Sequence, residues 1–271
     1  MEIYGGRARL YSFGELSSTN DELRNGGYDA PFDAVVAARQ TRGRGRNGKC
    51  FVSNEGGLYM SVLLEDGKFG SYITPLANKD NACVNTPCAA GASAGISADY
   101  VTPLAGVAVA DVLADYGLEA KIKWVNDVFV GGRKICGILA ERFEKNGRTF
   151  VCLGVGINVN NTDFGEYGGI ATSVVAQTAK KRDISETAEK FLARLSGLIC
   201  EKDKKYVIDR YREKSLALGK TVILSGSGIA EGERVTALDI DADGGLVVKN
   251  SEGRLFTVNS GSISLAGKYG E

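Results

Sequence analysis

The chain has 271 residues, of which 44% are hydrophobic, so it is long enough to bury one sizeable core together with a small second unit. Its 33 Lys and Arg residues balance 33 Asp and Glu residues, and this zero net charge predicts no long-range attraction to nucleic acid or to a membrane surface. The sequence contains no His, which excludes Ser-His-Asp and Cys-His catalysis.

The first half of the chain alternates between helix and strand patterns. Residues 17–22 have the composition of a helix start, in which Thr19 and Glu22 show the spacing of a capping box. The next regular elements expected are a buried strand at 33–39, an apolar strand at 57–65 and a helix at 102–118 that Gly117 ends. Residues 78–100 are rich in small and polar residues without periodicity, so we expect a loop or insertion with little helix there.

A β-hairpin is the clearest pattern of the middle of the chain. Residues 121–130 have strand character, and two further strands follow at 134–143 and 149–159. The dipeptide Asn146-Gly147 separates these last two strands, and Asn-Gly between apolar runs is the strongest short signal of a hairpin.

The C-terminal quarter of the chain changes from helical to strand composition. Residues 185–212 carry apolar positions at helical spacing, and short strands separated by Gly, Asp and Ser turns begin at about Leu218. These five strands are expected at residues 221–224, 234–240, 246–248, 255–258 and 262–265. The chain is therefore predicted to have an α+β fold, with a domain of residues 1–217 whose helices cover one face of a mostly antiparallel sheet, and an all-β domain of residues 218–271.

A segment rich in Gly and Arg, residues 40–49, is the most informative stretch of the sequence. Residues 42–49 hold three Arg and one Lys, interleaved with Gly. Glycine allows the backbone to approach a ligand closely, and the guanidinium group is a planar, permanently charged donor for phosphate. This composition indicates a phosphate clamp that can open and close.

Two other interpretations of this segment compete with a phosphate clamp. Gly43, Gly48 and Lys49 match the G-x-x-x-x-G-K pattern of a P-loop, but Cys50 stands where that motif needs a Ser or Thr for Mg²⁺. A solvated basic loop is the usual fate of a run of charges. Taken alone, the segment leaves the solvated loop and the functional site open.

Further motifs before and after this segment decide between these interpretations. They are STN at residues 18–20, KWVND at 123–127, GRKICGILAE at 132–141 and GVGINVN at 154–160. In this order and at this spacing, together with GRGRNGK, they resemble the motifs of the biotin–protein ligases. The resemblance spans about residues 10–265 and departs clearly at Val125, where the family usually has Pro.

This resemblance implies both a fold and a domain organisation. The family has a class II synthetase-like α+β catalytic domain with a mixed, mostly antiparallel sheet, followed by a small C-terminal SH3-like β-barrel. Regulatory members carry an additional N-terminal helix-turn-helix. Because the ligase motifs begin near Ser17, we expect a monofunctional enzyme that does not bind DNA.

The reaction implied by the resemblance has two steps. Biotin is activated with ATP and Mg²⁺ to biotinyl-5'-AMP, and the biotinyl group then passes to a lysine of a biotin carboxyl carrier protein or domain. Neither step requires a nucleophile of the enzyme, so the absence of His is no obstacle. The alternative is a lipoate or octanoate ligase or transferase of the same fold, and a nucleotide-binding module without catalysis is a second alternative.

The resemblance also implies roles for single residues. The catalytic residues expected are Arg46, Lys134 and Asp127, and Asp127 is expected to bind Mg²⁺ or to receive the proton of the acceptor lysine. The residues expected to bind biotin are Ser18, Thr19, Asn20, Gln40, Gly43, Arg44, Lys134 and Gly137. The residues expected to bind ATP are Arg46, Lys49, Trp124, Asn126 and Asn158. Helix capping is the alternative role for Ser18 and Thr19, and burial in the core is the alternative for Trp124.

Location and assembly are less strongly determined by the sequence. No segment approaches the roughly 20 apolar residues that span a bilayer, and the N-terminus lacks the pattern of a signal peptide. A cytoplasmic location without membrane association is therefore expected, with the six cysteines present as reduced thiols. A homodimer is left open.

Overall fold

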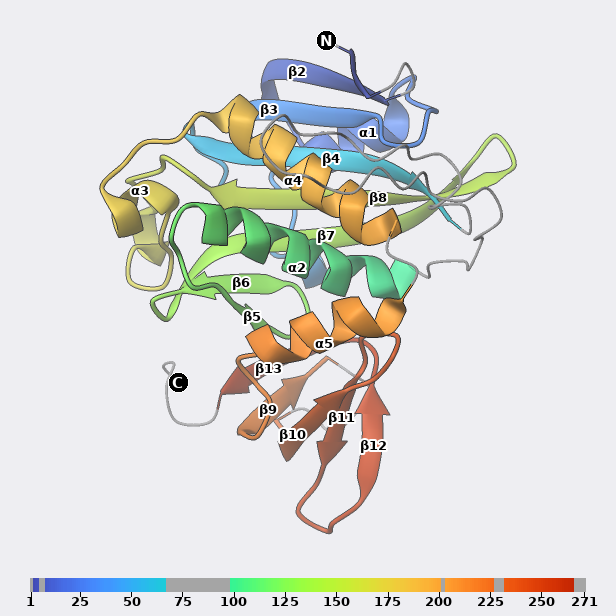
Figure 1. Cartoon of the computed structure of the whole chain (residues 1–271), viewed down its shortest axis with the longest axis vertical. Helices are drawn as coiled ribbons and strands as arrows, with labels where there is room; N and C mark the ends of the chain where they lie inside the picture. Colours follow the sequence, from blue (N-terminus) through green and yellow to red (C-terminus); the bar gives the residue numbers. More distant parts are fainter. Residues whose placement is uncertain (1, 5–7, 67–97, 201–202, 227–231, 266–271) are drawn as a thin grey trace.

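Two β-sheets, one large and one small, organise the molecule (Figure 1). The computed structural model describes residues 2–4, 8–66, 98–200, 203–226 and 232–265. The large sheet and its helices form the upper part of the view in Figure 1, and the small sheet lies below them at the C-terminal end of the chain. The expected α+β architecture is confirmed.

The large sheet is mixed and mostly antiparallel. Its strand order is β1-β2-β3-β4-β8-β7-β6-β5, and only β2 and β3 pair in parallel. The strands are β1 (Glu2–Tyr4), β2 (Ala8–Leu16), β3 (Ala34–Gln40), β4 (Gly57–Glu65), β5 (Lys121–Lys123), β6 (Asp127–Val130), β7 (Arg133–Lys145) and β8 (Arg148–Asn158). The hairpin predicted at Asn146-Gly147 is confirmed, with both residues at positive φ.

Strand β4 lies between β3 and β8, and this central place explains its composition. All nine of its residues are buried. Leu58 and Met60 face the main core, whereas Leu63 faces a second, smaller apolar cluster on the other side of the sheet. A strand covered on both faces needs a continuous apolar run, which is what the sequence GLYMSVLLE provides.

The helices cover both faces of the large sheet unequally. The helices are α1 (Thr19–Asn25), α2 (Ala98–Asp115), α3 (Val174–Thr178), α4 (Ile184–Cys200) and α5 (Lys204–Lys214). Helices α2 and α4 lie in front of the sheet in Figure 1, and α5 packs on α2 beside the small sheet. The prediction of helices on one face alone is wrong for α1, whose Leu23 packs with Val35 and Phe150 on the opposite face.

Three local predictions differ from the structure. The single strand expected at 121–130 is a hairpin of β5 and β6, because Trp124 and Val125 turn into the core between them. The helical stretch at 185–212 is divided into α4 and α5. Ser18, and not Thr19, caps α1, since the Ser18 hydroxyl accepts a hydrogen bond from the Asp21 N–H and Thr19 is the first helical residue.

The remaining predicted elements of the large domain agree with the structure. The strands expected at 33–39 and 57–65 correspond to β3 and β4, and the helix expected at 102–118 corresponds to α2, with Gly117 at positive φ beyond its end. Of the stretch 78–100, all but its last three residues lies outside the described part of the chain, and those three begin α2.

The small sheet contains the five strands predicted from the sequence, each within one residue of its expected bounds. They are β9 (Thr221–Ser225), β10 (Arg234–Ile240), β11 (Leu246–Lys249), β12 (Leu255–Val258) and β13 (Ser262–Leu265). They pair antiparallel in the order β12-β11-β10-β9-β13. One hydrophobic cluster runs from the large sheet through α5 into β9, β10 and β11, so the two units share a core. The domain boundary at 217/218 stays a prediction.

A buried hydrogen bond joins the two units. The Trp124 indole N–H donates to the Gly244 carbonyl at 2.9 Å. Within the large unit, the Tyr211 hydroxyl of α5 donates to the Val125 carbonyl at 3.1 Å, and the Trp124 and Tyr211 side chains are at most 2% exposed. Since a buried polar group without a partner costs free energy, the Trp124 bond ties the small sheet to the β5–β6 turn.

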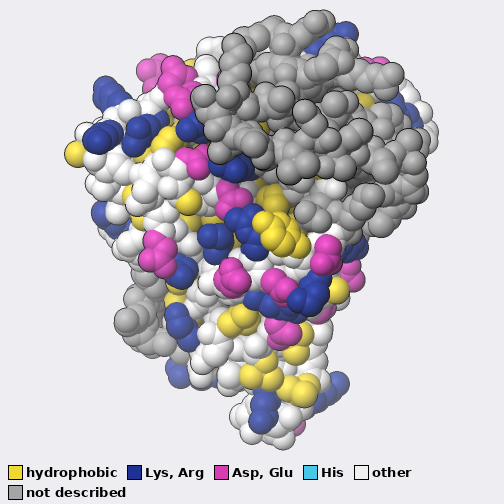
Figure 2. Space-filling model, in the orientation of Figure 1, with side chains coloured by type: hydrophobic (Ala, Val, Ile, Leu, Met, Phe, Trp, Pro, Cys, Tyr) yellow, Lys and Arg dark blue, Asp and Glu magenta, His cyan; other side chains and the backbone are white. Residues whose placement is uncertain are grey.

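Among the helices that the structure describes, none combines the length and the apolar character that crossing a membrane requires. On the face shown in Figure 2, acidic and basic side chains intermingle over the described surface. The balance of acidic and basic residues in the whole sequence is therefore also seen locally on this face, where charges of both signs lie close together.

Trp124→Phe tests the bond between the units. Phe keeps most of the apolar volume but leaves the Gly244 carbonyl without its buried donor, so the free energy of unfolding should fall by about 1–3 kcal/mol in urea denaturation. Leu255→Ala is the control, because Leu255 is 61% exposed and its truncation should change stability by less than about 0.5 kcal/mol. Equal stability of Trp124→Phe and the unaltered protein would show that this bond does not hold the units together.

Candidate functional site

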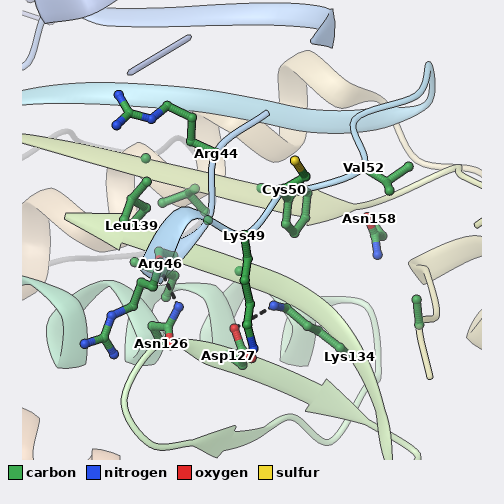
Figure 3. Close-up of a pocket in the computed structure, with 18 of the residues that line it drawn as sticks. Arg44, Arg46, Lys49, Cys50, Val52, Asn126, Asp127, Lys134, Leu139 and Asn158 are labelled. Carbon is green, nitrogen blue, oxygen red and sulfur yellow. Dashed lines mark hydrogen bonds and ion pairs between the residues drawn. The ribbon is translucent and has the colours of Figure 1, made fainter. Parts of the chain in front are cut away.

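A pocket of about 750 Å³ lies over strands β6, β7 and β8. The Gly–Arg segment covers it, and β13 of the small sheet contributes to its wall. Of the residues expected to bind ligands or act in catalysis, twelve line this pocket: Ser18, Thr19, Asn20, Gln40, Arg44, Arg46, Lys49, Asn126, Asp127, Lys134, Gly137 and Asn158. Residues from five separate motifs therefore meet at one place, and Figure 3 labels members of four of them.

One end of the pocket is polar and uncharged. The backbone N–H of Thr19 donates to Gln40 Oε1 at 2.8 Å, and the Thr19 hydroxyl lies 3.1 Å from the same oxygen. Ser61 Oγ lies 2.8 Å from Thr19 Oγ1 and 2.6 Å from Asn20 Oδ1. The start of α1 is thus fixed against β3 and β4 by amide and hydroxyl groups that present donors and acceptors without a net charge.

Asn20 connects this polar end to β7. Its side-chain N–H donates to Glu141 Oε2 at 2.8 Å. A Cβ at Gly154 would lie 2.2 Å from Asn20 Oδ1, so only Gly leaves room for the amide at this point of β8. The glycine of the GVGINVN motif therefore makes space for Asn20, and no dinucleotide-binding role is needed to explain it.

The middle of the pocket is apolar and shaped by two further glycines. The Phe51 ring lies against β7 and β8 where a Cβ at Gly137 would be 3.0 Å away and a Cβ at Gly156 would be 2.6 Å away. Gly137 and Gly156 are also paired across the two strands. These glycines form a flat floor on which an aromatic side chain, or a ligand of similar thickness, can lie.

The Gly–Arg segment is a tight turn tied to the pocket. The Gly45 N–H donates to the Lys49 carbonyl at 2.7 Å, and Asn47 and Gly48 adopt positive φ within the short 3-10 helix η1 (Arg46–Gly48). Gly43 does not line the pocket, contrary to the expected biotin contact. A Cβ at Gly43 would lie 2.3 Å from the Phe51 carbonyl, so this glycine allows the turn to close on itself.

Arg44 and Arg46 point in opposite directions (Figure 3). The Arg44 guanidinium is paired with carboxylates, at 2.6 Å from Asp21 and 3.4 Å from Glu141. Arg46 extends toward Asn126 and the small sheet, and its Nη1 donates to the Gly261 carbonyl at 2.9 Å. Arg44 therefore fastens the turn to α1 and β7, whereas no carboxylate of the described residues forms an ion pair with Arg46.

The end of the pocket opposite Gln40 holds a cluster of cations around one carboxylate. Lys134 Nζ lies 2.7 Å from Asp127 Oδ1. Lys49 reaches down from the turn toward this pair, and Lys123 lines the same wall as the cross-strand partner of Asp127. With Arg46, four cations therefore share one carboxylate, and this excess of positive charge is suited to bind phosphate.

Burial of this charge shifts two pKa values. Burial is the largest cause lowering the pKa of the Lys123 amine, which the charges of Lys134 and Lys49 lower further against the opposing effect of Asp127. Burial likewise lowers the pKa of the Arg46 guanidinium, and Asp127 opposes it. The cations thus lie in a partly dehydrated place, where their interaction with an anion is stronger than in water.

Backbone contacts fix the position of Lys134. Its N–H donates to the Ile170 carbonyl at 2.8 Å, and its own carbonyl accepts from the Thr172 N–H at 2.8 Å. The two asparagines of the site are also held by carbonyls, because Asn126 Nδ2 donates to Ile138 and Asn158 Nδ2 donates to Thr172. These bonds fix the orientation of the two amides that are expected to bind ATP.

Trp124 lies outside the pocket. It is 2% exposed within the main core, and its indole donates to Gly244. The expected contact between Trp124 and ATP does not fit this position, since the Trp124 side chain lies in the hydrophobic interior and does not line the pocket. Burial in the core, the alternative role for this residue, is what the structure shows.

Two pocket residues, Lys123 and Phe51, and the adjacent Glu141 were not predicted as site residues. Lys123 was identifiable in principle, because β5 alternates and the neighbouring Ile122 is buried in the core, which places Lys123 on the pocket side. Glu141 accepts a hydrogen bond from Asn20 and forms ion pairs with Arg24 and Arg44, and so it organises the polar end of the pocket from just outside it. Phe51 carried no signal in the sequence, because its role depends on glycines distant along the chain.

The described residues hold no cluster for a metal ion. The described cysteines, Cys50, Cys136, Cys152 and Cys200, are free, and Cys50 is exposed at the pocket. Burial raises the pKa of the Cys136 and Cys152 thiols, which makes both poor nucleophiles. In the described part of the chain, no three His, Cys, Asp or Glu side chains are grouped to hold a metal ion, and Asp127 is the one acidic residue that lines the pocket.

Comparison with known proteins identifies the family. Residues 15–158 match the Biotin/lipoate A/B protein ligase family, and residues 217–266 match the Biotin protein ligase C terminal domain. The biotin--[acetyl-CoA-carboxylase] ligase of Mycobacterium tuberculosis is 30% identical over 261 residues, which cover 92% of this chain and 86% of that protein. The chain belongs to the biotin protein ligase family.

Other members of the biotin protein ligase family align over different lengths. The bifunctional ligase/repressor BirA of Bacillus spizizenii is 36% identical over 155 residues, and the chain spans only 40% of the length of that relative. A solved biotin protein ligase from Aquifex aeolicus, in complex with biotin and ATP, superposes with a TM-score of 0.73 at 29% identity and covers 94% of this chain and 97% of its own. The expected fold, including the SH3-like C-terminal unit of this family, is confirmed.

Gly154→Ala tests how the polar end of the pocket is built. The added Cβ must displace the Asn20 amide from Ser61 and Glu141, so the free energy of unfolding should fall by about 1–3 kcal/mol. Gly14→Ala is the matched control in strand β2, because no atom lies within 4 Å of a Cβ placed there. Chemical denaturation of both variants measures the difference, and a Gly154→Ala variant as stable as Gly14→Ala would contradict the packing described for Asn20.

Proposed function

We propose that this chain activates biotin with ATP to biotinyl-5'-AMP and transfers the biotinyl group to a lysine of a biotin carboxyl carrier protein or domain. The observation that supports this most strongly is the division of a single pocket into three parts. An uncharged polar end formed by Thr19, Asn20 and Gln40 leads over an apolar floor to the cations around Asp127. The chemical groups of biotin follow in the same order: an uncharged polar ureido head, an apolar chain and a carboxylate.

The first step joins this carboxylate to ATP. A carboxylate oxygen of biotin attacks the α-phosphate, the bond from that phosphorus to the β-phosphate oxygen breaks, and pyrophosphate leaves. Lys134 lies beside Asp127 at the point where the ends of the two substrates would meet, and its ammonium lowers their mutual repulsion. Arg46, Lys49 and Lys123 would receive the remaining phosphate charge, so positioning and electrostatics suffice without imidazole.

Asp127 has a role in each step of the proposed reaction. As the carboxylate among these cations, it is the residue that would hold Mg²⁺ together with the phosphates of ATP, and one carboxylate plus substrate oxygens is a usual set for this ion. Bound Mg²⁺ would neutralise charge on the leaving pyrophosphate. In the second step an acceptor lysine must lose a proton before it attacks the carbonyl carbon and releases AMP, and Asp127 can accept that proton.

The covering turn would protect the intermediate. Biotinyl-5'-AMP is a mixed anhydride that water hydrolyses, so the pocket must exclude water between the two steps. Arg44 holds the turn over the pocket through Asp21 and Glu141. Its role is therefore to fasten the cover, in addition to the biotin contact expected from the sequence, since Arg44 also lines the pocket.

A lipoate or octanoate ligase of the same fold is the second candidate. The match of residues 217–266 to the Biotin protein ligase C terminal domain favours biotin. The polar end of the pocket also favours biotin, because the ureido group of biotin can form hydrogen bonds with the Thr19, Asn20 and Gln40 groups that the apolar ends of lipoate and octanoate cannot form. A cytoplasmic location remains part of the proposal, and a homodimer stays open, with β1 at one edge of the large sheet and β5 at the other edge already bridged to Ser215.

Pyrophosphate exchange tests the proposed activity. The protein is incubated with ATP, Mg²⁺ and labelled pyrophosphate, and the label should enter ATP only when biotin is added. Lipoate and octanoate are tested in parallel. Exchange with lipoate or octanoate but not with biotin would replace the proposed substrate, and no exchange with any of the three acids would remove the activity.

Lys134→Ala is expected to lower the rate of biotin-dependent exchange by at least about 100-fold, because it removes a fixed cation facing the reacting phosphate. The fold should survive, since the backbone bonds of Lys134 to Ile170 and Thr172 do not involve its side chain. Lys121→Ala is the control on strand β5 of the same sheet, where the amine pairs with Glu119 outside the pocket. A Lys134→Ala variant that exchanges as fast as Lys121→Ala would exclude Lys134 from the mechanism.

A further inference from the structure

The Gly–Arg turn contacts the small sheet at the rim of the pocket. Arg46 Nη1 donates to the Gly261 carbonyl at 2.9 Å, and Gly261 and Ser262 line the pocket beside it. A Cβ at Gly226, in the same sheet region, would lie 3.7 Å from Asn47 Nδ2. Arg46 and Asn47, two neighbouring residues of the turn, therefore lie against the C-terminal unit. Arg46 and Gly261 are 215 positions apart in the sequence.

The partner of Arg46 differs in kind from the partners of Arg44. Asp21 and Glu141 neutralise much of the Arg44 charge. A backbone carbonyl has only a dipole, so Gly261 orients the Arg46 guanidinium without cancelling its charge. No ion pair to Arg46 exists among the described residues, and the guanidinium therefore keeps its charge available for an anion in the pocket.

Gly261 is suited to this contact by its backbone. It is buried in the turn between β12 and β13 and has a φ of 128°, a conformation that residues with a Cβ rarely adopt. A side chain at this position would force the turn into another conformation and move the carbonyl away from Arg46. The geometry of the contact thus depends on glycine at residue 261.

We infer that the β12–β13 turn is a positioning element of the active site: the Gly261 carbonyl orients Arg46 toward bound phosphate, so the small C-terminal sheet sets the affinity of the pocket for ATP and the retention of the adenylate. Arg46 is the residue that touches the phosphates, and Gly261 acts through it. This inference rests on the proposed function for the identity of the anion.

Gly261→Ala in the full chain tests the inference. The KM for ATP should rise by about tenfold or more and preformed biotinyl-5'-AMP should dissociate faster, while the KM for biotin stays within about twofold, because only the phosphate side loses its oriented donor. Gly253→Ala is the matched control, since Gly253 also has positive φ, at 84°, but lies in an exposed turn of the same sheet. It should leave the KM for ATP unchanged.

A double substitution separates positioning from a general structural effect. In an Arg46→Ala background, Gly261→Ala should cause no further increase in the KM for ATP, because the residue through which it acts is already gone. Additive effects of the two substitutions, or equal increases for Gly261→Ala and Gly253→Ala, would overturn the inference.

Amide hydrogen exchange of Arg46→Ala tests the contact even where Gly261→Ala does not fold. Loss of the guanidinium should speed exchange in residues 259–262 and leave residues 250–254 unchanged. Unchanged exchange in residues 259–262 would refute the contact. Since this measurement needs no substrate, it stays informative where the unaltered protein shows no biotin-dependent exchange of pyrophosphate, an outcome that would refute the proposed function alone.

Discussion

An excess of positive charge around Asp127 is the interaction on which the site depends. Lys134, Lys123 and Lys49 approach this carboxylate from three different segments, and Arg46 completes the group from the covering turn. Lys123, Lys134 and Arg46 are half-buried and Lys49 is exposed, so partial dehydration of the first three strengthens their attraction to a bound anion. The chain has zero net charge, and acidic and basic side chains are mixed on the surface seen in Figure 2. The pocket differs from that surface because its cations outnumber its carboxylates.

The rest of the fold holds this charge in place. The β5–β6 turn buries Trp124 between the two units and thereby sets Lys123 across from Asp127. At the opposite end, glycines on β7 and β8 admit Asn20 and Phe51 to the sheet surface. The large sheet thus lets side chains lie close to its backbone at these glycines, and it offers a surface for a ligand that is neutral at one end and charged at the other. The small sheet borders the charged end.

The sequence predicted the elements and the membership of the site better than it predicted individual contacts. Strand β4 and the five strands of the small sheet were recognisable because their patterns are local. The motifs located most of the pocket, since each keeps its spacing on one strand or turn. Trp124 and Gly43, which were expected to contact ligands, do not line the pocket, and Phe51 was missed, because whether a residue faces a pocket or the core is decided by strands that meet only after folding.

The central claim is that the cations around Asp127 direct a carboxylate onto the α-phosphate of ATP, and an oxygen label tests it directly. Biotin labelled with ¹⁸O in its carboxylate is converted in the presence of ATP, Mg²⁺ and a carrier domain, and the released AMP is analysed by mass spectrometry. The account predicts one ¹⁸O atom in the AMP phosphate and none in pyrophosphate. Label in pyrophosphate, or its absence from AMP after complete transfer, would contradict it.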